Sequence, residues 1–235
     1  MRNDMTAEQG PYPGSAEARL SRRGFVKAGA ALGASLALPD LAWAQRTEIH
    51  DLRGSVKVNG QTATMKTIIK PGDHVVTGSD GYIVFIIGDD AFMLRSRSEL
   101  KIQPREDAPL LAGFLNLVTG ALGATFKRGG GKRSIQVGTI TAGIRGTGVY
   151  METRGDGTYF CTCWGSVELQ SNDDPKDRQV IESKNHTPLL VTPKPAKGTR
   201  FKSAAFETHS DQEMDILEKC VDRRSPILFP EWFTK

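Results

Sequence analysis

Two cysteines separated by one residue have the clearest chemical potential in this sequence. Cys161 and Cys163 flank Thr162 in an apolar run, and alternate residues of a β-strand point to the same face. Their sulfur atoms would therefore lie on one side of the strand, where they suit packing or a shared ligand. A disulfide between the two would be strained.

The third cysteine, Cys220, leaves three interpretations open. In an oxidising compartment, three cysteines favour one disulfide, here from Cys220 to Cys161 or Cys163, with one thiol left over. Three buried thiols, and a metal or redox site at Cys161 and Cys163, are the alternatives. No cofactor is assigned from the sequence. The histidines are scattered, and His186 or His209 would join the cysteines as metal ligands only if the fold brought them together.

Arg145 and Thr147 belong to the densest motif, Ile144-Arg-Gly-Thr-Gly148. Glycines on both sides of the threonine permit a tight bend or a close backbone approach. An arginine can bind a carboxylate through two parallel hydrogen bonds. The motif favours a fold-defining turn, and a ligand or partner contact by Arg145 and Thr147 is the alternative. A dinucleotide-binding loop is excluded, because the third glycine is missing and a strand is predicted to follow.

A basic, glycine-rich run, Phe126-Lys-Arg-Gly-Gly-Gly-Lys-Arg133, precedes that motif. It would attract phosphate or an anionic surface, but it lacks the Lys-Ser/Thr ending of a P-loop. A solvated hairpin tip is the favoured interpretation.

Short β-strands are the elements predicted to position these residues. From residue 51 onward, short apolar runs alternate with Gly, Asp or Asn at intervals of about 8–12 residues. The continuous apolar run Tyr82–Ile87 predicts a strand buried on both faces. We therefore expect an all-β protein, with short antiparallel strands in a compact sandwich or a solenoid-like stack.

The tail, residues 172–235, differs from the β domain predicted at 45–171. Its prolines favour extended chain. Ser210 and Glu213 match a capping box, and apolar residues follow at helical spacing. One amphipathic helix is predicted over roughly 211–223, where it would cover an open face or edge of the β domain.

Residues 1–44 are predicted to be a twin-arginine signal peptide. Arg22 and Arg23 precede a short apolar run, and Ala42-Trp-Ala44 fits an A-x-A cleavage site. The run of about 11 residues is too short for a bilayer, which needs about 20. We expect recognition by the twin-arginine export machinery, cleavage after Ala44, a periplasmic location and no stable membrane span afterwards.

Composition indicates a globular protein without an electrostatic case for nucleic acid. Of the 235 residues, 38% are hydrophobic and 25% are charged, which suffices for a core and argues against disorder. The formal net charge is only +4, whereas nucleic-acid binders concentrate Lys and Arg on one face. Nucleic acid is therefore not an expected partner.

The order of the glycine turns resembles that of a FecR domain over about residues 51–170. The matching segments are Gly54-Ser-Val-Lys-Val-Asn-Gly60, Ile69-Lys-Pro-Gly-Asp73, Val76-Thr-Gly-Ser-Asp-Gly81, Leu94-Arg-Ser-Arg-Ser-Glu-Leu100, Leu115-Asn-Leu-Val-Thr-Gly-Ala-Leu122 and Ile140-Thr-Ala-Gly-Ile-Arg-Gly-Thr-Gly148. FecR-type domains are periplasmic β modules, which in the named members belong to transmembrane regulators of a sigma factor. The resemblance implies the module and not the signalling circuit, because we expect neither a cytoplasmic regulatory segment nor a mature membrane span here.

We therefore expect a non-enzymatic binding or sensing module. It would recognise an envelope protein or a glycan through exposed loops or a strand edge. The alternative is a metal- or redox-linked periplasmic protein that uses Cys161 and Cys163. No catalytic residue is predicted, because the sequence lacks the G-x-S-x-G and H-E-x-x-H motifs.

Overall fold

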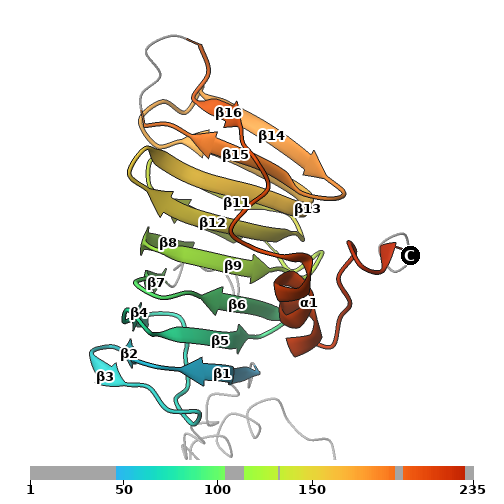
Figure 1. Ribbon diagram of the computed structural model, residues 1–235. Coiled ribbons are helices and arrows are strands. Elements are labelled where there is room, and N and C mark those ends of the chain that lie inside the picture. The colour runs from blue at the N-terminus through green and yellow to red at the C-terminus, as the bar shows by residue number, and fades with distance from the viewer. Residues whose placement is uncertain (1–45, 104–113, 132, 194–197, 231–235) are drawn as a thin grey trace, which may run out of the picture. The chain divides into compact units, whose positions relative to one another are not determined.

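Strands dominate the computed structural model, which describes residues 46–103, 114–131, 133–193 and 198–230 (Figure 1). The predicted signal peptide, with Arg22, Arg23 and Ala44, lies outside these residues. The all-β prediction with one C-terminal helix is confirmed.

The strands form two layers. The first layer contains, in hydrogen-bonded order, β1 (Thr47–Arg53), β5 (Tyr82–Ile87), β6 (Asp90–Leu94), β9 (Ala121–Thr125), β12 (Gly148–Arg154), β13 (Gly157–Ser171), β15 (Thr187–Val191) and β16 (Phe201–Ser203). The second layer contains β3 (Gln61–Thr62), β2 (Val56–Val58), β4 (His74–Thr77), β7 (Glu99–Gln103), β8 (Phe114–Thr119), β10 (Arg133–Val137), β11 (Ile140–Ile144), the second part of β13, and β14 (Arg178–Ser183). Residues beyond 171 thus add β14, β15 and β16 to the two layers.

The long strand β13 belongs to both layers and joins them into one hydrogen-bonded path. Thr158–Thr162 pairs with β15, and Gly165–Gln170 pairs with β14. The change of layer falls at Gly165, whose φ is +90°. A Cβ atom there would lie 2.4 Å from the side chain of Thr147, so only glycine allows this close approach.

Antiparallel pairing holds throughout the described strands except between β8 and β10, which are parallel. The chain leaves β8, crosses to β9 in the first layer, and returns as β10 beside β8. One such circuit is a solenoid turn, and it brings the chain back in the same direction. The parallel pair β8–β10 is an exception to the predicted antiparallel pairing, and it follows from the solenoid-like path of the chain.

Alternate residues of β5 serve two cores. Ile83 and Phe85 face the main core between the layers, whereas Val84 and Ile86 face a second apolar cluster on the outer side of the first layer. All four side chains are buried. The prediction that the run Tyr82–Ile87 is buried on both faces is confirmed.

Helix α1 (Asp211–Cys220) covers the second cluster, as predicted, and lies across β6 and β9 (Figure 1). Its capping box is complete: Ser210 accepts a hydrogen bond from the backbone N–H of Glu213, whose carboxylate accepts one from the Ser210 N–H. The helix ends earlier than predicted, because the backbone leaves the helical conformation after Cys220. Among the described residues, no helix is long and apolar enough to cross a membrane.

Loss of this cap should destabilise the protein modestly. Ser210→Ala removes the side-chain acceptor at the start of α1, and we expect unfolding to become easier by about 1 kcal/mol. Urea unfolding measures the effect. Ser79→Ala, in an exposed turn, serves as the control and should change the midpoint little; equal effects of the two substitutions would contradict a specific capping role.

Candidate metal centre

The cysteines of the C-x-C motif share one face of β13, as their spacing predicts. Cys161 and Cys163 are both 0% exposed and belong to the cluster beneath α1. Their sulfurs are not bonded to each other. Two free thiols thus lie side by side in a region shielded from water.

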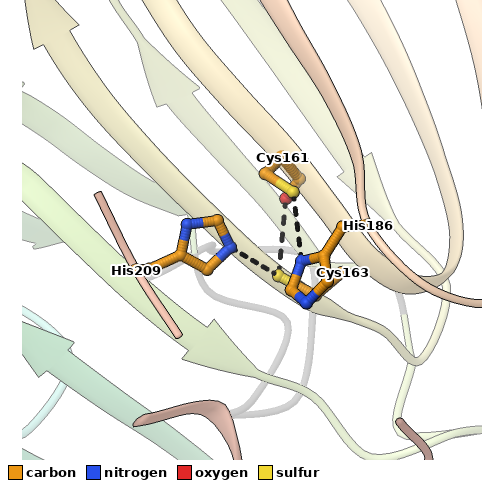
Figure 2. A group of neighbouring side chains, drawn as sticks. All are labelled: Cys161, Cys163, His186 and His209. Atoms are coloured by element: carbon orange, nitrogen blue, oxygen red, sulfur yellow. Dashed lines mark hydrogen bonds between the residues drawn. The ribbon is translucent and has the colours of Figure 1, made fainter. Parts of the chain in front are cut away.

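Two histidines approach these thiols from segments distant in sequence (Figure 2). His186 lies in the turn between β14 and β15, where its φ is +44° and its backbone N–H donates to the carbonyl of Cys163 over 2.9 Å. His209 lies just before α1 and follows Thr208, whose φ is +67°. Both side chains point toward the cysteines (Figure 2).

The four side chains bring their donor atoms close together. His186 Nδ1 lies 3.5 Å from Cys161 Sγ, and His209 Nε2 lies 3.4 Å from Cys163 Sγ. All four donor atoms lie within 4.8 Å of one another. Zinc bonds of about 2.3 Å to sulfur and 2.05 Å to nitrogen place tetrahedral S and N ligands about 3.6 Å apart. The observed separations therefore fit a single Cys₂His₂ ion.

Each histidine also has an acceptor for its other ring nitrogen. His186 Nε2 lies 2.7 Å from a carboxylate oxygen of Asp211, and His209 Nδ1 lies 3.1 Å from the carbonyl oxygen of Glu207. Because both partners are acceptors, these two nitrogens carry hydrogens. A neutral ring then directs its lone pair at the cysteines, which is the orientation that metal-binding histidines need.

Aromatic side chains hold the histidines in place and exclude water. Tyr150 stacks on His209 with ring centroids 4.4 Å apart, and Phe206 packs on His186 at 4.0 Å. The Tyr159 hydroxyl accepts from the Glu207 N–H over 3.3 Å, which anchors the segment that carries His209. His209 itself is 7% exposed.

The two thiols differ in acidity. The hydrogen bond from Cys163 lowers the pKa of Cys161 to about 4, and the neighbouring histidines add to this effect against the opposing influence of burial. Burial raises the pKa of Cys163 above its ordinary value. Burial would lower the pKa of His186, but its hydrogen bonds to Cys161 and Asp211 raise it overall. The pocket therefore favours the thiolate form of Cys161, which is the form that binds a metal ion.

The carboxylate of Asp211 should be important for metal affinity although it is not a ligand. Asp211→Asn keeps the four donor atoms but weakens the hydrogen bond that orients His186, and we expect zinc affinity to fall about 10- to 100-fold. Competition with a chromogenic chelator measures this change. Asp222→Asn, at the exposed far end of α1, should leave zinc affinity unchanged; an equal loss in that variant would indicate a general charge effect.

The predicted disulfide to Cys220 is wrong, because all three cysteines are free and buried. Asp211 contacts His186 at the start of α1, whereas Cys220 ends the helix nine residues later. Those residues place Cys220 about 13 Å farther along the helix axis, whereas bridged Cα atoms lie within about 7 Å. Burial raises the pKa of Cys220 to about 11, as expected of a packed, unreactive thiol.

Arg145 and Thr147 occupy the turn between β11 and β12. Thr147 is 0% exposed, and a Cβ on Gly148 would lie 2.5 Å from the Trp164 ring. This tight packing supports a fold-defining turn. Arg145 is exposed and lines a cleft.

The sequence predicts that Cys161 and Cys163 lie together, but it gives no indication of the supporting residues Asp211, Glu207 and Tyr150. No local signal was available for them, because each acts through a histidine that the fold brings to β13 from elsewhere in the chain. Compared with known proteins, the chain matches no family model, no curated protein and no solved structure. The resemblance to FecR domains therefore stays a prediction.

Proposed function

We propose that this protein binds one zinc ion through Cys161, Cys163, His186 and His209, and that the ion has a structural role. The observation that carries the proposal is that the two sulfurs and two ring nitrogens lie within 4.8 Å of one another. The other ring nitrogen of each histidine is already hydrogen-bonded. Two thiolates and two imidazoles suit zinc, and four protein ligands leave no open position for a substrate. A closed, buried site agrees with a non-enzymatic role.

The ion would connect three segments of the chain. β13 supplies both sulfurs, the β14–β15 turn supplies His186, and the segment before α1 supplies His209. With twin-arginine export, which moves folded proteins, this site would be assembled before the protein reached the periplasm. Export and periplasmic location are part of the proposal and rest on the sequence of residues 1–44.

Metal analysis of the purified protein tests the proposal. We expect one zinc per chain, and cobalt substitution should produce sulfur-to-cobalt charge-transfer bands. Native protein should resist thiol alkylation, whereas denatured protein should expose three reactive thiols. Protein that contains no metal and takes up none on titration would overturn the zinc proposal.

A second function is proposed for a separate surface: recognition of an envelope partner by a rigid β scaffold of FecR type. The specific observation in its favour is a pair of polar clefts that meet at Arg145. These clefts are lined by turn residues and by strand residues, and loops held by a rigid scaffold commonly carry recognition sites. Here the zinc centre would support the fold, and the clefts would contact the partner.

A further inference from the structure

The motif around Arg145 and the basic run at 126–133 meet in space. A Cβ on Gly146 would lie 2.6 Å from the Cα of Arg128, so the glycine allows the two segments to approach closely. Gly146 also has a φ of +69°. The backbone N–H of Arg145 donates to the carbonyl of Ser166 over 3.2 Å, which ties the turn to β13. These contacts hold both arginines beside one cleft.

That cleft has a volume of about 490 Å³ and presents three cationic side chains, from Arg128, Arg145 and Lys184. All three are exposed. Within the described chain, the side chains of Arg145 and Lys184 form no hydrogen bond or ion pair. Their positive charges repel one another, and an anion between them would relieve that repulsion. An arginine fork suits the paired oxygens of a carboxylate or a phosphate.

The same cleft also presents groups that suit a hydroxylated ligand. Glu182 is an exposed acceptor in its wall, and Ser166 adds a hydroxyl group. A simple anion would leave the Glu182 carboxylate without a donor. A ligand with both an anionic group and hydroxyls would bind the cationic side chains and also donate hydrogen bonds to the Glu182 carboxylate.

A second cleft, of about 620 Å³, shares Arg145 and is lined in part by Ser134 and Glu168. Both volumes lie in the range of about 300–1,000 Å³ typical of small-ligand sites. Two adjoining polar clefts with a shared arginine suit an extended ligand with repeated polar units.

We propose that these clefts bind an acidic saccharide, with its carboxylate or phosphate held by Arg145 and Lys184 and its hydroxyls by Glu182, Ser166 and Ser134. This inference rests on the second proposed function, partner recognition, and specifies the partner's chemistry. It does not depend on the zinc centre.

Calorimetric titration of the zinc-loaded protein with four probes tests the saccharide proposal. The probes are a uronic-acid oligosaccharide, a phosphorylated oligosaccharide, a neutral oligosaccharide of equal length and inorganic phosphate. We expect one of the two acidic oligosaccharides to bind, which identifies the anionic group, and the neutral one to bind at least about tenfold more weakly. Binding should weaken with added salt. Equal binding of the neutral oligosaccharide, or of inorganic phosphate alone, would overturn the proposal.

Paired variants keep the test specific. Arg145→Gln with Lys184→Gln should reduce affinity about tenfold or more. Lys57→Gln with Lys202→Gln removes the same charge from exposed positions on other strands and should leave affinity unchanged. Equal losses in the two double variants would overturn the site assignment.

A parallel capture from envelope extract separates this inference from the recognition function itself. If a protein is captured through Arg145 and Lys184 and no saccharide binds in the titrations, the saccharide proposal is overturned. The proposed recognition of an envelope partner is then retained. If neither a saccharide nor a protein binds, both proposals fail.

Discussion

Replacing Cys163 by serine is expected to weaken zinc binding about 100-fold or more. The free energy of binding structural zinc is about 10–16 kcal/mol in small domains. One of four ligands would carry roughly a quarter of that free energy. A serine hydroxyl is a poor substitute because it stays protonated at neutral pH. Chelator competition measures the affinity, and the loss of sulfur-to-cobalt bands reports the ligand directly. Cys161→Ser should behave in the same way.

Cys220→Ser is the matched control for this experiment. Cys220 is also buried and free, but it lies at the other end of α1 and outside the four-residue cluster. We expect full zinc affinity in this variant. His186→Gln and His209→Gln provide an independent check if the cysteine variants fold poorly. Unchanged affinity in all four ligand variants would exclude this cluster as the metal centre.

Removal of zinc by a chelator should produce the second large effect, a lower unfolding temperature. If free zinc stands about 1,000-fold above its Kd, binding stabilises the native state by about 4 kcal/mol. In a protein of this size, each kcal/mol corresponds to about 2–4 °C, so the midpoint should fall by roughly 8–16 °C. Thermal unfolding followed by circular dichroism, with and without chelator, measures the difference.

The physical reason is that the proposed ion would join segments that are far apart in sequence. Cys161 and His186 are 25 residues apart, and Cys163 and His209 are 46 apart. Zinc therefore closes long loops that are open in the unfolded chain. In the Cys163→Ser protein the same free zinc stands only about tenfold above the weakened Kd, so the chelator effect should shrink to about 1.4 kcal/mol, or roughly 3–6 °C. A chelator effect of equal size in that variant would show that the stabilising ion binds elsewhere.

Much of the fold was predictable because its signals are local. The continuous apolar run of β5 predicts burial on both faces, and the structure places one face on the main core and the other beneath α1. Ser210 and Glu213 predict the start of α1, and their reciprocal hydrogen bonds confirm it. The parallel pair β8–β10 was not predictable in this way, because it depends on which layer the intervening strand joins.

The site was only partly predictable. The spacing of Cys161 and Cys163 places both sulfurs on one face, because side chains alternate along a strand. The same local reasoning assigned Cys220 to a disulfide. Local patterns do not show that the first residue of α1 lies near His186, whereas its last residue, Cys220, lies a helix length away from that histidine. Cysteine number and compartment therefore favoured a bridge that the geometry does not permit.

The sequence by itself determined the strand pattern, the turns, the helix start and the shared face of the two sulfurs, since each depends on residues a few positions apart. Only the tertiary structure decided that His186 and His209 meet those sulfurs, and that Arg145 meets Arg128 and Lys184. Contacts between distant segments depend on how strands pair and where β13 changes layer. No short-range pattern encodes that arrangement, so the candidate metal centre and the cleft emerge only from the folded chain.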